Sequence, residues 1–92
     1  MDEDEDERRT REQLMLHEAL VKAMDRRGEV FEVVEDSENV DEAIQRVGQL
    51  LGLGELGSRV VLDMQVRRFT RDQRQAIASY AEELRSRLPE GR

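Results

Sequence analysis

Cysteine and tryptophan are missing from this chain of 92 residues, and histidine, proline and tyrosine each occur once. Without cysteine there are no disulfides, thiol nucleophiles or thiolate metal ligands. A single histidine argues against a histidine-based zinc site and against a serine–histidine triad. No apolar run approaches the roughly 20 residues that span a bilayer, and no signal peptide opens the chain. These absences predict a cytoplasmic protein that is not an enzyme and holds neither metal nor cofactor.

Charge is plentiful but unevenly distributed. Charged residues make up 40% of the chain, and the net charge is −7. The run Asp2–Glu7 supplies six of these negative charges, so the rest is nearly neutral rather than basic, unlike a nucleic-acid-binding domain. Like charges in such a run repel one another and bury no apolar surface, which predicts a disordered acidic arm over residues 1–10. Residues 11–92 are predicted to form one helical domain, because this length leaves room for a single small core.

Apolar residues recur at helical spacing, and no segment alternates as a strand does, which predicts an all-α fold. Gly28 interrupts the first pattern and leaves open a bend near Arg27, because glycine weakens a helix interior. The four expected helices cover residues 11–35, 40–51, 55–69 and 71–88.

Polar and glycine residues mark the helix boundaries. Asn39 and Glu42 form a variant of the capping box at the start of the second helix, and Gly52 is a typical helix stop. Thr70 and Gln73 have the spacing of a second capping box, which predicts the start of the last helix.

The third predicted helix is apolar on more than one side, because Val60, Val61 and Leu62 follow one another. A helix of this kind must be enclosed on several sides, and a chain this short has few elements to do so. The pattern therefore predicts a second copy, with Glu55 and Arg59 as charges at the rim of the interface. The expected contact residues are Leu50, Leu53, Leu56, Val60 and Val61.

Residues Gly52 to Gly57 have the G-x-G-x-x-G spacing of a phosphate-binding loop. Such a loop follows a strand, whereas here an amphipathic helix comes first and Glu55 would repel a phosphate. The motif instead predicts a turn between helices, with Gly52 ending one helix and Gly54 near the start of the next. His17 is predicted to lie on the surface or at a dimer seam, and Tyr80 to be a half-buried packing residue.

Four arginines lie close together, and their charge allows two interpretations. They could contact phosphate groups or the acidic arm, or they could be solvated side chains near a helix end. The scarcity of aromatic residues for base stacking argues against binding of a single nucleic-acid strand, and DNA contact by this chain alone is not expected. These residues are Arg67, Arg68, Arg71 and Arg74.

A family resemblance is carried by the ten residues Val61-Leu62-Asp63-Met64-Gln65-Val66-Arg67-Arg68-Phe69-Thr70. They resemble the Ile-Leu-Asp-Met-Arg-Leu-(Gln/Arg)-Arg-Leu-Thr motif of the DNA gyrase A protein and its topoisomerase IV counterpart. The resemblance extends over about residues 14–88, and includes His17-Glu18-Ala19-Leu20 and Tyr80-Ala81-Glu82-Glu83-Leu84. In that family the segment is the exit gate, or C-gate, where two subunits meet about a two-fold axis at the end of a coiled coil.

The resemblance implies an antiparallel helical hairpin, a coiled-coil stub, capped by a small helical dimerisation globule. It implies a homodimer and no catalysis, since the family's strand-cutting tyrosine belongs to another domain. Two alternatives stay open. The chain could regulate a full-length gyrase A protein, or its topoisomerase IV counterpart, by binding it through the same interface. It could instead contact DNA weakly through residues 67–74.

Overall fold

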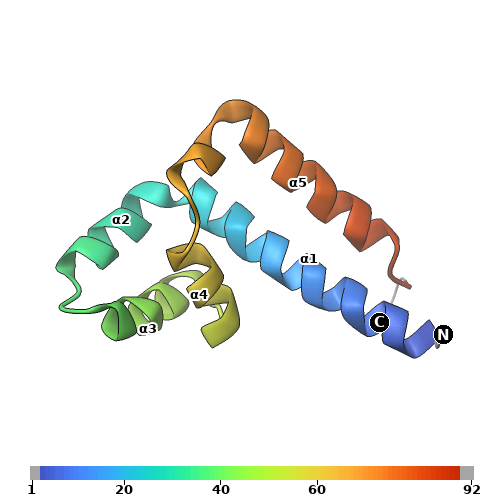
Figure 1. The fold of residues 1–92 in the computed structure, drawn as a ribbon, viewed down its shortest axis with the longest axis horizontal. Helices are drawn as coiled ribbons and strands as arrows, with labels where there is room; N and C mark the ends of the chain where they lie inside the picture. The colour runs from blue at the N-terminus through green and yellow to red at the C-terminus, as the bar shows by residue number, and fades with distance from the viewer. Residues whose placement is uncertain (1–2, 90–92) are drawn as a thin grey trace.

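The computed structural model describes residues 3–89, which form helices and turns without any strand, so the all-α prediction is confirmed (Figure 1). Its principal extents are 44 × 27 × 23 Å. The elements in chain order are α1 (Glu3–Asp25), α2 (Arg27–Asp36), α3 (Val40–Leu51), α4 (Glu55–Leu62), the 3-10 helix η1 (Val66–Phe69) and α5 (Arg71–Ser86).

The first and last helices, α1 and α5, run antiparallel and pack against each other over much of their length (Figure 1). Leu84 is completely buried in α5, and Ile77 joins Leu20 and Met24 of α1 in one apolar cluster. At the edge of the pair, Arg85 forms an ion pair with Glu18 across the two helices. The predicted pairing of the chain's first and last helices is therefore present.

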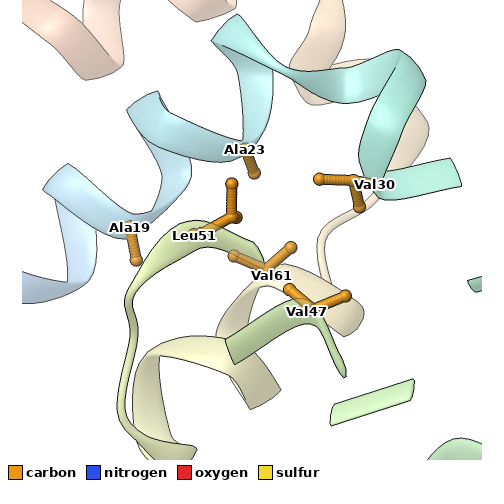
Figure 2. Close-up of a cluster of buried hydrophobic side chains, with 6 residues drawn as sticks. All are labelled: Ala19, Ala23, Val30, Val47, Leu51 and Val61. Atoms are coloured by element: carbon orange, nitrogen blue, oxygen red, sulfur yellow. The ribbon is translucent and has the colours of Figure 1, made fainter. Parts of the chain in front are cut away.

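The remaining helices gather at the C-terminal end of α1, where α3 and α4 pack against it and against each other (Figure 1). Helix α3 is amphipathic, so its apolar face turns inward while its charged face stays in solvent. Figure 2 shows the resulting core, in which small side chains of α1 let the other helices approach. Its buried members are Ala19, Ala23, Val30, Val47, Leu51 and Val61.

A break at Arg26 divides the first predicted helix into α1 and α2, so the expected continuous helix over 11–35 is not found. Arg26 has φ −126° and ψ 36°, outside the helical region. Its guanidinium donates hydrogen bonds to the Leu50 carbonyl at 3.0 Å and to the Glu29 carboxylate at 2.7 Å. The bend thus lies next to the position that Gly28 suggested, and a contact with α3 accompanies it.

The structure also differs from the predicted disordered arm, because α1 begins at Glu3 and residues 3–10 are helical. Carboxylates are favourable in the first turn of a helix, where the backbone dipole is positive. Glu7 and Arg11 add an ion pair one turn apart, with 2.8 Å between Oε2 and Nη2. Residues 1–2 lie outside the described residues.

The predicted third helix ends early, since α4 stops at Leu62 and residues 66–69 form η1 instead. The predicted capping box at Thr70 is also wrong, because its side chain does not cap α5. The Thr70 hydroxyl donates to Asp72 Oδ1 at 2.7 Å, and Asp72 accepts from the backbone N–H of Gln73 at 2.8 Å. A carboxylate two residues further on thus receives the hydrogen bonds at this helix start.

Candidate interaction surface

The turn between α3 and α4 is built by two glycines. Gly52 ends α3 with φ +70°, a left-handed conformation that favours glycine, and Gly54 occupies the position before α4. At the other end of α3, Asn39 Oδ1 accepts from the backbone N–H of Glu42 at 2.8 Å. The predicted bounds 40–51 are confirmed, and the glycine motif is a turn between helices, as predicted.

Small residues bring α3 and α4 unusually close together. A Cβ atom at Gly48 would lie 2.8 Å from Ser58 Oγ and 3.0 Å from the carbonyl oxygen of Leu53. Gly57 is buried on the other side of α4, where an added Cβ would lie 3.5 Å from the Cβ of Ala19 in α1. The close approach of α3 and α4 therefore depends on the absence of a side chain at Gly48, whereas a Cβ atom at Gly57 would make ordinary van der Waals contacts.

A groove of about 700 Å³ opens between α3 and the start of α4. At its floor Ser58 is 1% exposed, and its Oγ has no hydrogen-bond partner among the described residues. Leu53 contributes apolar surface, whereas the rim is polar and charged. The groove is lined by Asp41, Ile44, Gln45, Gly48, Gln49, Leu53, Gly54, Glu55, Ser58 and Arg59.

The predicted contact residues have different environments. Val61 is only 5% exposed and lies in the core, so a single chain accounts for it without a partner. Leu50, Leu53 and Val60 are partly buried beside the two apolar clusters. Leu56 is 52% exposed, although it lies in the middle of the predicted contact set.

We expected that one chain could not bury the apolar side chains of its middle third, about residues 40–69. This expectation is wrong for most of that region. Ile44, Val47, Leu51 and Val61 are all buried within a single copy. The apolar side chain that stays exposed on α4 is Leu56. Val60 lies one turn after Leu56 on α4, and Leu53 lies in the turn before the helix; these three residues form the apolar stripe.

Glu55 and Arg59, predicted as rim charges between two copies, pair with each other one turn apart on α4. The distance from Arg59 Nη2 to Glu55 Oε2 is 2.7 Å, and both side chains are more than half exposed. The hydrogen bond to Glu55 raises the pKa of Arg59 above its ordinary value. Both ends of this pair lie beside the groove and the apolar stripe.

The arginine cluster lies elsewhere, on η1 and the first turn of α5. Arg67 and Arg68 line a smaller depression of about 340 Å³ with Val60 and Met64. Arg71 and Arg74 follow on α5, where they are separated by three residues and lie on neighbouring positions of the helix surface. The structure therefore keeps the four arginines near one another and places them outside the α3–α4 groove.

His17 and Tyr80, the chain's histidine and tyrosine, take part in packing between helices. His17 Nδ1 lies 2.9 Å from the Gln13 carbonyl oxygen, and its ring contacts Tyr80 edge-on with centroids 4.8 Å apart. This contact places the two residues between α1 and α5. Among residues 3–89 no group of three His, Cys, Asp or Glu side chains is arranged to hold a metal ion. Within the same range no helix is long and apolar enough to cross a membrane.

Sequence reasoning missed Gly48 and Ser58. A glycine inside an amphipathic helix reduces helix stability, so its presence in the 40–51 pattern was a signal of close packing. Nothing in the sequence marked Ser58, because a serine in a helix is usually exposed.

Part of the sequence is similar to a known protein. No protein-family profile matches the chain. A segment of 70 residues is 37% identical to the DNA gyrase A protein of Mycobacterium bovis and of two Mycobacterium tuberculosis strains, CDC 1551 and H37Rv. The chain is similar to part of gyrase A. The match covers 76% of this chain but only 8% of the length of those relatives. Similarity to gyrase A thus concerns one small helical segment.

Proposed function

We propose that this chain is a non-catalytic protein-interaction module in which two copies meet through α4 and the turn before it. The arrangement is that of a gyrase-type exit gate, the role implied by the resemblance in the 61–70 motif. The observation that carries the proposal is the stripe of Leu53, Leu56 and Val60, in which Leu56 is 52% exposed on a helix that otherwise turns its apolar side chains inward.

A two-fold axis beside α4 would bring the stripes of two copies into contact with each other. In an isologous dimer the same patch serves both copies, so the exposed Leu56 of each would be covered by the apolar stripe of the other. The Glu55–Arg59 pairs would lie at the rim and could exchange partners between copies. Each such exposed pair contributes less than about 1 kcal/mol, so the apolar contact provides most of the affinity.

The absence of catalysis in this proposal follows from the extent of the similarity. The chain matches 8% of gyrase A, and the resemblance assigns that segment to the gate rather than to strand cleavage. We also propose a cytoplasmic location for the chain.

The test is Leu56→Asp. The side chain is exposed in one copy, so the fold should survive, whereas a carboxylate buried at the interface without a partner should weaken dimerisation by about 100-fold. Sedimentation velocity should show a dimer for the unchanged chain and a monomer of 10.7 kDa for the variant. Val66→Asp is the matched control, because Val66 is 75% exposed on η1, outside α4 and the turn before it. A monomeric unchanged chain, or an unchanged dimer with Leu56→Asp, contradicts the proposal.

A second candidate is regulation of gyrase through a mixed dimer. It is favoured by the 37% identity to gyrase A, since an interface similar to that of the relative could accept one gyrase A protein in place of a second copy. Capture of purified gyrase A by the immobilised chain, followed by a supercoiling assay, tests the idea. Leu56→Asp should abolish both capture and inhibition. Absence of capture at micromolar concentration would exclude this candidate and leave the homodimer unaffected.

A further inference from the structure

Within the described part of the chain, four neighbouring arginines have no carboxylate partner. Arg11, Arg26, Arg46, Arg59, Arg85 and Arg87 each form an ion pair. Across residues 3–89, by contrast, Arg67, Arg68, Arg71 and Arg74 take part in none of the ion pairs. The nearest carboxylate in the sequence, Asp72, is engaged by Thr70 and by the backbone of Gln73. Arg67 and Arg71 are exposed, so their positive charge is available to an external anion, although the chain as a whole is acidic. Arg68 and Arg74 are half-buried, and Arg74 Nε is buried without a hydrogen-bond partner among the described residues.

The start of α5 strengthens this positive potential. Arg71 and Arg74 lie in the first turn of a 16-residue helix, where the backbone dipole is itself positive. Cations are unfavourable at this end of a helix, and Asp72 compensates only one of them. An anion bound here would be stabilised by the side chains and by the helix terminus together.

The fold adds aromatic surface to the same region. Phe31 of α2 and Phe69 of η1 are 38 positions apart in sequence, yet their ring centroids lie 5.8 Å apart. Phe31 remains 49% exposed, and Phe69 directly follows Arg68. Arg27, one turn before Phe31 on α2, is also exposed. The fold thus brings Phe31 against Phe69, which adjoins the arginine cluster, and the sequence alone did not reveal this contact.

We propose that this basic–aromatic patch, formed by Phe31, Phe69, Arg67, Arg68, Arg71 and Arg74, binds a single strand of nucleic acid. The arginines contact the phosphodiester backbone, and the exposed ring of Phe31 stacks on an unpaired base. A single strand fits better than a duplex because the bases of a duplex are already stacked on each other. The patch borders the α4 stripe at Val60, which lines one depression with Arg67 and Arg68, and its own members lie on α2, η1 and α5. The inference does not rest on the proposed dimer.

Binding is tested by fluorescence anisotropy with a labelled oligothymidylate of about 20 nucleotides. Three or four phosphate contacts predict that affinity falls roughly 20- to 50-fold between about 50 and about 200 mM salt. The double variant R68Q/R71Q should bind at least about tenfold more weakly at low salt. The control R11Q/R87Q removes the same charge from ion-paired arginines outside the patch and should bind as the unchanged chain does.

The aromatic contribution is tested at Phe31. Phe31→Leu keeps an apolar side chain but loses the flat ring, and should weaken oligothymidylate binding about tenfold, whereas Phe31→Tyr should retain it. Circular dichroism confirms that each variant is folded. No binding at about 50 mM salt would overturn the proposal, as would equal losses for the two arginine pairs. Unchanged affinity of the Phe31→Leu variant, or displacement of the oligonucleotide by polyglutamate at equal charge concentration, would overturn it as well.

Discussion

Gly48 of α3 lies against Ser58 of α4, and this close approach shows how single residues determine the packing of two helices. A side chain at Gly48 would meet Ser58 Oγ at 2.8 Å and a backbone carbonyl at 3.0 Å, so α4 would have to move away. Gly28 offers the opposite case, because an added Cβ there would meet nothing within 4 Å. A substitution at Gly48 therefore tests the effect of steric crowding, and a substitution at Gly28 tests the effect of helix propensity alone.

Gly48→Ala is expected to lower the free energy of unfolding by about 1–3 kcal/mol, because the new methyl group overpacks the α3–α4 contact. Gly28→Ala is expected to raise it by up to about 1 kcal/mol, since alanine favours the helix and enters open space. Urea denaturation followed by circular dichroism measures both. Equal effects of the two substitutions would show that α3 and α4 are not held as closely as described.

At the scale of the helices, the boundaries that depend on local residues were predicted correctly. The boundaries that depend on tertiary contacts were not. The bounds of α3 were predicted because Asn39 and Gly52 act on the backbone within a few residues. The division between α1 and α2 was not predicted in full, because Arg26 donates to a carbonyl 24 residues away. The start of α5 was located correctly, but its hydrogen bonds involve Asp72 rather than the Thr70–Gln73 box.

The start of α5 gives a prediction about pH. The Thr70 hydroxyl, and then the Gln73 backbone N–H, hold the pKa of Asp72 below its ordinary value of 3.8. A carboxyl group whose pKa is lower in the folded state stabilises the fold above its unfolded pKa, and this contribution is lost as pH falls through the folded pKa. The destabilisation caused by Asp72→Asn should therefore be larger at neutral pH than at a pH well below 3.8.

Thermal unfolding of the Asp72→Asn variant and the unchanged chain, at neutral pH and at acidic pH, measures this difference. Thr70→Val removes the largest cause of the lowered pKa, so it should reproduce part of the effect. A difference in Tm that stays constant across the pH range would contradict the assignment.

At the scale of the whole molecule, α1 belongs to both apolar clusters. Its Ala19 and Ala23 pack against α3 and α4, while Leu20 and Met24 pack against α5. Sequence periodicity identified the apolar faces of the helices. It could not show that α1 packs over the apolar faces of α3 and α4. The same limit applies to the basic–aromatic patch, since the contact that assembles it joins positions 31 and 69.

This shared role of α1 predicts an uneven distribution of local stability. Backbone amides of residues 19–24 lie where both clusters meet, so they should exchange with solvent only when the whole domain unfolds. Residues 4–13 belong to the same helix, but their side chains are mostly exposed and pack against little, so their amides should exchange through local fraying. Hydrogen exchange followed residue by residue by NMR compares the two halves of one helix directly. Equal protection along α1 would mean that its N-terminal turns are held by contacts beyond those within one copy, and would point to a partner on that end of the molecule.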